Sequence, residues 1–188
     1  MPSLTAETDC FPEGLLVKWK EPNTDASPDR RWWVIHTRAR QEKSLARDLL
    51  GYRIPFYLPQ VEKTSIVRGR KRTSFIPLFT SYLFMYGDEA ERYTSLTTNR
   101  IAQVLPVKNA EELTHELLQI SRLIEFKAPL TLESRLKPGD RVRVVRGSLV
   151  GVEGTVRSRR RKCRLLVAVN LIQQGVSVEI DDYLLERI

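Results

Sequence analysis

The chain has 188 residues, of which 41% are hydrophobic and 29% are charged, and its formal net charge is +8. These fractions are those of a folded globular protein and exclude a disordered chain. The apolar runs are too short to cross a bilayer, and the opening MPSLTAETDCFPEG lacks the basic and then apolar pattern of a secretory signal.

Two cysteines (Cys10, Cys163) and two histidines (His36, His115) are too few and too scattered for a disulfide framework or a metal site. We therefore expect a cytoplasmic protein that holds no metal and uses no cofactor. No nucleophile–base pair and no phosphate-binding glycine loop stands out, so we do not expect an enzyme.

The positive charge is unevenly distributed along the chain. Residues 1–30 carry a net charge of −3, residues 31–126 carry +5, and residues 134–188 carry +6. Two basic regions behind an acidic start make a polyanionic partner such as nucleic acid plausible. Charge alone does not separate that hypothesis from an ordinary soluble protein with a high pI.

Residues 1–30 are predicted to be a flexible tail with one apolar patch, Leu15–Val17 and Trp19. That patch either packs on the body of the protein or docks elsewhere. The next residues predict a strand at 31–37, a helix at 41–50 that ends at Gly51, and a hairpin from 56 to 76 with a basic tip at 68–71.

A strand at 78–86 follows, then a helix that starts near Asp88, a strand at 101–107, and a helix capped by Asn109. The order β-α-β-β-α-β-α is that of a split βαβ sandwich of sheet and helices. The strand LFTSYLFMY is apolar or aromatic on both faces. It is therefore either buried on both sides or open on one side to a partner.

Pro129 and Pro138 flank a polar stretch, so we expect a linker at 127–137. After it, valines alternate with arginines and glycines recur at short spacing, which predicts five short strands at 138–188. A small antiparallel barrel is the expected fold of that part.

These stretches resemble the NusG family of transcription elongation factors. The segments WWVI (32–35), PLFTSYLF (77–84) and GDRVRVVRGSLVGVEGTV (139–156) carry the resemblance, which covers 31–188. It implies an α+β fold, with an NGN-type split βαβ domain at 31–126 and an all-β KOW (SH3-like) barrel at 138–188. IVRGRKRT…PLFTSYLF (66–84) and LLVAVNLIQQ (165–174) look closest to RfaH-like specialised paralogues.

The resemblance implies an apolar depression in the NGN domain that receives the clamp helices of RNA polymerase. Aromatic side chains in a desolvated pocket suit such a contact. The polymerase-binding residues would be Trp33, His36, Phe79 and Tyr82, with Tyr93 and Thr94 facing the opposite pincer. Leu83, Phe84 and Met85 are instead expected in the core.

Other positions match nucleic-acid or partner contacts of the family. Arg38, Arg40, Gln41 and Arg100 would contact non-template DNA, unless they form only a solvated basic rim. Leu171 and Ile172 would bind ribosomal protein NusE or Rho, unless they fold onto the barrel. A basic tip, Arg159, Arg160, Arg161 and Lys162, could touch nascent RNA through its phosphates.

The family implies a monomeric, non-enzymatic factor that binds the polymerase clamp, increases processivity and suppresses pausing or termination. Specialised paralogues hide the docking surface under a refolded barrel, locked by an acid whose position is Ile76 here. The strand-favouring RVRVV and VSVEI predict a permanent barrel. The alternatives are the housekeeping elongation factor, which should bind Rho, and a KOW-type RNA-binding or ribosome-assembly protein.

Overall fold

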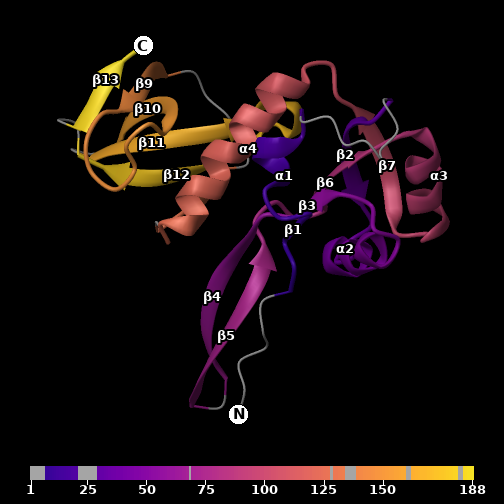
Figure 1. Cartoon of the computed structure of the whole chain (residues 1–188). Coiled ribbons are helices and arrows are strands. Elements are labelled where there is room, and N and C mark those ends of the chain that lie inside the picture. Colours follow the sequence, from indigo (N-terminus) through magenta and orange to yellow (C-terminus); the bar gives the residue numbers. More distant parts are fainter. Residues whose placement is uncertain are drawn as a thin grey trace. The chain divides into compact units, whose positions relative to one another are not determined.

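The computed structural model describes residues 7–20, 29–67, 69–127, 129–133, 139–159, 162–181 and 184–188. The chain divides into two compact units, Met1–Ala110 and Glu111–Ile188 (Figure 1). Each unit contains its own antiparallel sheet and its own helix or helices. The mixed α+β class predicted from the sequence is confirmed.

The sheet of the first unit has the order β1-β3-β6-β2-β7. Its central strands are β2 (Arg31–Thr37) and β6 (Tyr82–Gly87), with β7 (Ile101–Pro106) beside β2 and β3 (Phe56–Tyr57) beside β6. The predicted strand at 78–86 is shorter in the structure because Ser81 has a φ of 64°, a left-handed conformation that interrupts an extended chain. Strand β6 therefore begins only at Tyr82.

Two helices, α2 (Glu42–Gly51) and α3 (Glu89–Thr97), accompany this sheet. Leu45 and Leu49 of α2 share a core cluster with Trp33, Ile35 and other sheet residues of the same face. The predicted helix start near Asp88 is confirmed, because a complete capping box closes it. The Asp88 side chain accepts from the Glu91 amide, and the Glu91 side chain accepts from the Asp88 amide.

The opposite face of the sheet carries Trp32, Val34, Phe84 and Tyr86, since directly paired residues share a face. The N-terminal segment lies on this side. Strand β1 (Cys10–Phe11) pairs with β3, and α1 (Leu15–Lys18) follows with Leu15 and Leu16 buried. The Tyr86 hydroxyl donates to the Trp19 carbonyl over 3.1 Å, and the two rings meet edge to face.

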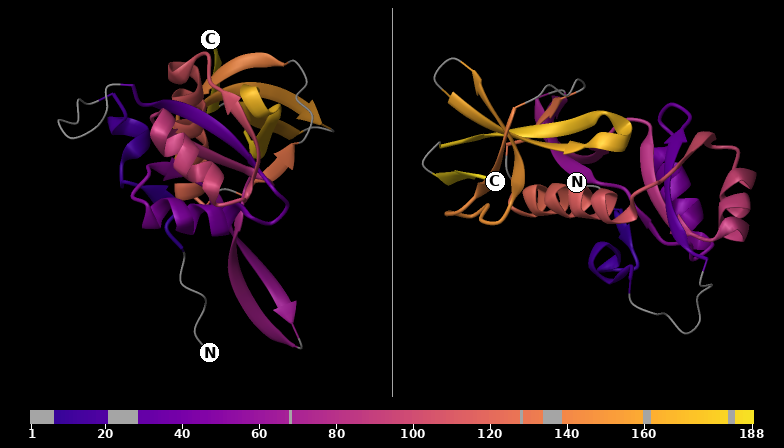
Figure 2. Two further views of the ribbon diagram at one scale, coloured as in Figure 1. Left: turned by 90° about the vertical axis from the view of Figure 1, so that its right-hand side faces the viewer. Right: turned by 90° about the horizontal axis from the view of Figure 1, so that it is seen from above.

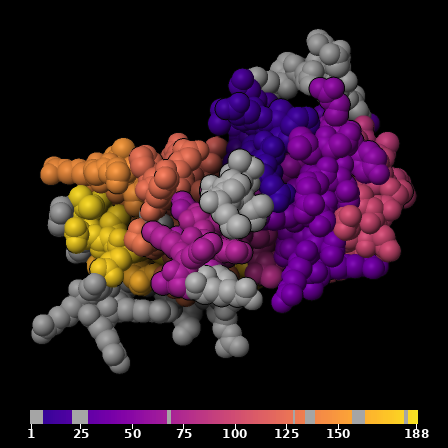
Figure 3. Space-filling view, turned by 90° about the horizontal axis from the view of Figure 1, so that it is seen from below, coloured from indigo at the N-terminus to yellow at the C-terminus, as the bar shows by residue number. Residues whose placement is uncertain are grey.

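Part of the expected flexible tail is therefore structured. Of its apolar patch, Leu15, Leu16 and Trp19 pack on the body of the protein, whereas Val17 is 71% exposed. A two-residue strand forms here because β3 offers it an open edge, which is a tertiary property that the tail's own sequence does not reveal. In the space-filling view from below, the indigo N-terminal residues lie directly against the purple surface of the first unit (Figure 3).

A long hairpin extends from the first unit. Strands β4 (Gln60–Val67) and β5 (Arg70–Pro77) form a separate two-stranded sheet in continuous register from Gln60↔Pro77 to Val67↔Arg70. It stands away from the five-stranded sheet in Figure 1 and in the left view of Figure 2. Of the expected basic tip at 68–71, Gly69 has a φ of 73° in the turn and Arg70 and Lys71 begin β5, whereas Arg68 lies outside the described residues.

The sheet of the second unit has the order β13-β9-β10-β11-β12-β8. Its strands are β8 (Thr131–Glu133), β9 (Asp140–Val144), β10 (Glu153–Arg159), β11 (Lys162–Val169), β12 (Gln174–Ile180) and β13 (Leu185–Arg187), with a short 3-10 helix, η1 (Asn170–Ile172). Within the described residues, β13 and β8 each pair with one strand, so the ladder stays open. The expected closed KOW barrel is thus not shown, although the expected run of short antiparallel strands is.

Helix α4 (Ala110–Glu125) packs within the second unit from Glu111 onward. Leu113, Leu117 and Ile120 on its inner face are buried, and Ile124 is half-buried. Its polar side chains reach the sheet: the Glu153 amide donates to Gln119, and the His115 ring lies 3.5 Å from the Glu153 carboxylate. The grouping differs from the predicted boundary at 126, and β8 occupies part of the expected linker at 127–137.

Candidate functional site

Of the four residues expected to form the apolar depression, His36, Phe79 and Tyr82 lie on one side of the sheet, where the Tyr82 amide donates to the Phe79 carbonyl over 3.2 Å. Trp33 lies on the other side. Trp33 faces the helices α2 and α3, and its indole Nε1 donates to the Gly87 carbonyl over 3.0 Å. Phe79 is fully buried and meets Phe84 edge to face, with ring centroids 6.4 Å apart. Both side chains support the fold rather than present themselves to a partner.

His36 and Tyr82 form a contiguous aromatic pair at the other end of the same face as Phe84. They are directly opposed across β2 and β6, and their rings lie 5.1 Å apart. Both side chains are half-buried, unlike Leu83, Phe84 and Met85, which are fully buried. The stretch LFTSYLFMY is therefore neither buried on both faces throughout nor open along one whole face. Residues 83–85 belong to the core, and Tyr82 reaches solvent.

Tyr93 and Thr94 lie on α3. Tyr93 is 60% exposed, and the Arg92 guanidinium lies 4.6 Å from its ring centroid. Arg92 also pairs with Glu89, which lowers the pKa of that carboxyl through hydrogen bonding. Thr94 donates its hydroxyl to the Ala90 carbonyl within the helix. Tyr93 is therefore a large apolar surface that a partner can cover.

The residues expected to contact DNA gather around the turn between β2 and α2. Arg100 donates to Asp48 over 2.5 Å and to the Gln41 side chain over 2.6 Å. The Arg38 amide donates to the Arg100 carbonyl, which ties the two backbones together. Arg38 and Arg40 are exposed, whereas the pairing with Asp48 partly neutralises Arg100. Arg38 and Arg40 are thus the cations of this set that are more open to an anion.

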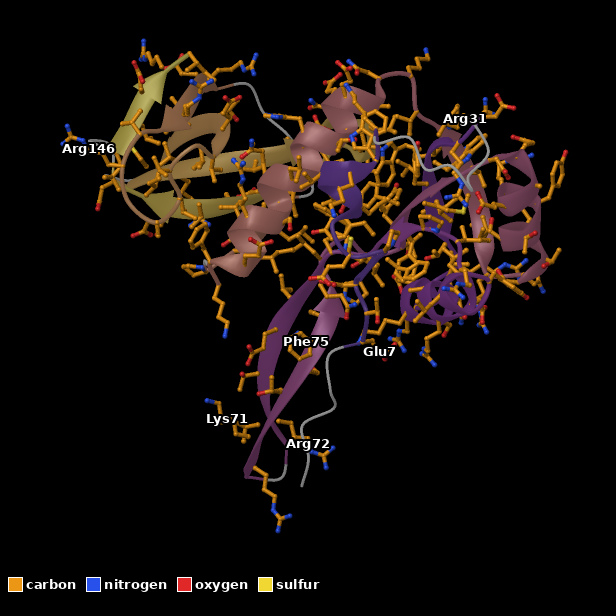
Figure 4. All side chains as sticks on the ribbon, viewed as in Figure 1. Glu7, Arg31, Lys71, Arg72, Phe75 and Arg146 are labelled. Atoms are coloured by element: carbon orange, nitrogen blue, oxygen red, sulfur yellow. The ribbon has the colours of Figure 1, made fainter. Side chains whose placement is uncertain are left out.

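Sequence reasoning missed a groove between α2 and the base of the hairpin. Its volume is about 450 Å³, and three cationic side chains line it. Its lining consists of Arg40, Glu42, Lys43, Ser44, Arg47, Phe75, Ile76, Pro77 and Thr80. The spacing of Lys43 and Arg47 at i and i+4 along a predicted helix was the available signal. Figure 4 labels Phe75 on the hairpin and Glu7 beside it.

In the second unit, the expected pair Leu171 and Ile172 is split. Leu171 is 40% exposed, whereas Ile172 is 7% exposed and folds inward. The preceding residue, Asn170, donates through its side chain to Glu116 of α4 over 2.6 Å, and its amide donates to the same carboxylate. Burial raises the pKa of Glu116 to about 7, although the Asn170 amides oppose that rise.

The basic tip expected to touch RNA is only partly described. The backbones of Arg159 and Lys162 pair at the ends of β10 and β11. Their side chains, and both Arg160 and Arg161, lie outside the described residues. Over the part of the chain that the structure describes, no helix is long and apolar enough to cross a membrane, and no three His, Cys, Asp or Glu residues could together hold a metal.

Comparisons with known proteins found several similar solved structures and one matching family model. The similar solved structures include one titled "Domain interaction in Thermotoga maritima NusG" (17% identity, TM-score 0.43, 85% of this chain and 97% of that chain) and one of the MjSpt4:Spt5 complex (14% identity, TM-score 0.30, 84% of this chain and 98% of that chain). A search of curated proteins found no match. The family model described as "Transcription termination factor nusG" matches residues 30–135, more than half of the chain, and the protein therefore belongs to the NusG family.

Proposed function

We propose that this protein is a transcription elongation and antitermination factor that binds the clamp helices of RNA polymerase, increases processivity and suppresses pausing or termination. Family membership supports the polymerase as partner. The observation that carries the docking surface is the His36–Tyr82 pair, two half-buried aromatic rings in contact at the end of an otherwise covered sheet face. Aromatic anchors of this kind dominate interface energies.

The docking surface differs from the one first expected. Because Trp33 and Phe79 are buried, they hold the sheet in shape while His36 and Tyr82 make the contact. Tyr93, with its exposed ring, serves a second contact together with Thr94. A factor bound at two such places on a mobile enzyme favours the state in which both contacts form, which is the physical basis of suppressed pausing.

The second unit recruits another partner through Leu171, in the manner of a KOW domain, with NusE as the candidate; binding of Rho would instead favour the housekeeping elongation factor. We place the chain with the RfaH-like specialised paralogues on the strength of residues 66–84 and 165–174. The five strands β9–β13 support a permanently β-structured second unit. The factor is not an enzyme. Burial raises the pKa of the Cys10 thiol to about 11, so we assign this one cysteine no nucleophilic role near pH 7.

The test is binding of the full chain to purified RNA polymerase, wild type against His36→Ala/Tyr82→Ala. The matched control is Tyr52→Ala, which removes a ring that is 53% exposed at the end of α2. We expect the double variant to lose at least ten-fold in affinity and the control to lose less than two-fold, with circular dichroism showing that all three are folded. Equal affinities would refute clamp docking through this pair.

The exposed basic hairpin supports a second candidate function, that of an RNA-binding or ribosome-assembly protein. Lys71 and Arg72 are exposed on a ribbon that extends away from the sheet of its unit (Figure 4). Strong binding of structured RNA by a chain that does not bind polymerase would favour this alternative.

A further inference from the structure

The sheet face that carries the His36–Tyr82 pair continues through Phe84 to Tyr86, and the protein covers that second end with its own N-terminal segment. Alternate residues of β6 share a face, so Tyr82 and Tyr86 lie about 13 Å apart along one strand. Tyr86 is paired with Trp32 across β6 and β2, and their ring centroids are 5.3 Å apart. One end of this aromatic face is therefore open to solvent, and the other end is not.

Three apolar side chains of the segment hold it on the body of the protein. Leu15 and Leu16 of α1 are 4% and 5% exposed. The Trp19 ring meets the Tyr86 ring edge to face, with 6.1 Å between the centroids, and the Tyr86 hydroxyl donates to the Trp19 carbonyl over 3.1 Å. Trp19 thus occupies the place on Tyr86 that an apolar side chain of a partner would take.

The rest of the segment is attached by short elements and exposed charges. Strand β1 has two residues and α1 has four, and elements of that length are not stable by themselves. Glu7 lies 3.2 Å from Arg47 Nε and 3.9 Å from Lys43 Nζ, and partly exposed ion pairs of this kind add little stability. The segment therefore keeps its place through contacts with the body of the protein, and it can leave without breaking the β6–β2 pairing.

The covered end of the face contains buried donors without acceptors. Trp32 is 1% exposed, and its indole Nε1 donates to no acceptor among the described residues. Burial raises the pKa of Tyr86, and the nearby charge of Arg30 opposes that rise. The Nε of Arg30 is also buried without an acceptor in the part of the chain that is described. Unpaired buried donors cost free energy, so this end suits a partner that brings carbonyl or carboxylate oxygens as well as apolar side chains.

We propose that residues 9–19 form a displaceable cap on this face, and that the clamp helices of RNA polymerase replace the cap so that Trp32 and Tyr86 join His36 and Tyr82 in one contact. A helical partner suits the face because two turns of an α-helix, about 11 Å, nearly span the distance from Tyr82 to Tyr86. This inference rests on the proposed function and adds to it a second half of the docking surface and a competitor for that half.

The cap lowers the affinity of the free protein for polymerase by the fraction of molecules in which it is open, so a weaker cap gives tighter binding. Trp19→Ala in the full chain should bind purified polymerase about two- to ten-fold more tightly, because an edge-to-face pair of rings is worth about that factor. The matched control is Val17→Ala, which truncates a side chain of the same helix that is 71% exposed and should leave the affinity unchanged.

The role of Tyr86 in the contact is tested where the cap is already weak. Trp19→Ala/Tyr86→Ala should bind at least five-fold more weakly than Trp19→Ala, since the ring that the partner covers is then missing. Hydrogen exchange of the wild type gives a readout that needs no substitution. On addition of polymerase, residues 9–19 should lose protection, and so should the Leu58 amide, which donates to the Asp9 carbonyl in the free protein.

The cap would be overturned by a Trp19→Ala chain that binds no more tightly than the wild type, or by protection of residues 9–19 that persists in the complex. Equal affinities of Trp19→Ala and Trp19→Ala/Tyr86→Ala would remove Tyr86 from the contact. Failure of clamp docking gives a different pattern, because His36→Ala/Tyr82→Ala would then bind as the wild type does. Failure of the cap alone leaves that double variant weak and Trp19→Ala unchanged.

Discussion

Replacing Glu116 by glutamine should stabilise the second unit at neutral pH. The carboxyl lies between α4 and η1, where it accepts from the side chain and the amide of Asn170. Burial raises its pKa from 4.5 to about 7, and the neighbouring Glu112 adds to that rise. At about 1.4 kcal/mol per pH unit, the upper limit of the ionisation cost is about 3 kcal/mol. Since the side chain is only half-buried, we expect about 1–2 kcal/mol.

The sign follows from the direction of the pKa change. A carboxyl whose pKa is higher in the folded state contributes its full stability below pH 4.5, and this contribution is lost as the pH rises through about 7. The wild type should therefore lose stability between those values. Glutamine keeps an acceptor for Asn170 but cannot ionise, so the variant should not show this loss.

Calorimetric unfolding of the full chain at pH 5.0 and 8.0 measures the effect. Glu116→Gln should unfold at a higher temperature than the wild type at pH 8.0, with a smaller difference at pH 5.0. Glu125→Gln, an exposed acid on the same helix, is the control and should leave both transitions unchanged. A Glu116→Gln variant less stable than the wild type at pH 8.0 would show that the Asn170 bonds to the ionised carboxylate outweigh the cost of its burial.

Two further substitutions test local features by thermal unfolding. Asp88→Ala removes the capping box that Asp88 forms with Glu91 and should cost about 1 kcal/mol, and a change below about 0.3 kcal/mol would contradict the capping role. Gly154→Ala would place a Cβ 2.4 Å from the Leu166 carbonyl oxygen and should cost about 2 kcal/mol. Gly51→Ala is the control, because a Cβ added to Gly51 at the end of α2 would meet nothing within 4 Å. This variant should be neutral or stabilising. Equal losses of stability at the two glycines would rule out crowding as the cause.

Much of the first unit is predictable from local sequence. The helix at Glu89 was found because Asp88 and Glu89 favour a helix start, and α2 because its leucines repeat at helical spacing. Strand β1 was not predictable, because its two residues become a strand only by pairing with β3. The early start of the strand at 78–86 was wrong because the left-handed Ser81 has no signature in an apolar run.

The candidate site was likewise only partly predictable from the sequence. Arg100 and Gln41 were expected to serve one surface, and the structure brings their side chains into direct contact. Trp33 and Phe79 point into the core, which the sequence could not decide because both strand faces are apolar. The groove beside Lys43 depends on where a hairpin folds relative to α2, and Glu7 reaches it only because β1 holds the segment in place.

The hairpin β4–β5 also affects whether copies of the protein associate with one another. It is a two-stranded ribbon that pairs with neither larger sheet in the described residues, so its outer backbone groups offer an edge to any other extended chain. Lys63, Lys71 and Arg72 are exposed along it, and like charges on two ribbons repel one another. The positive charge that would attract a polyanion therefore also opposes edge-to-edge association of two hairpins. A bound polyanion would neutralise that charge, but it would also cover the ribbon.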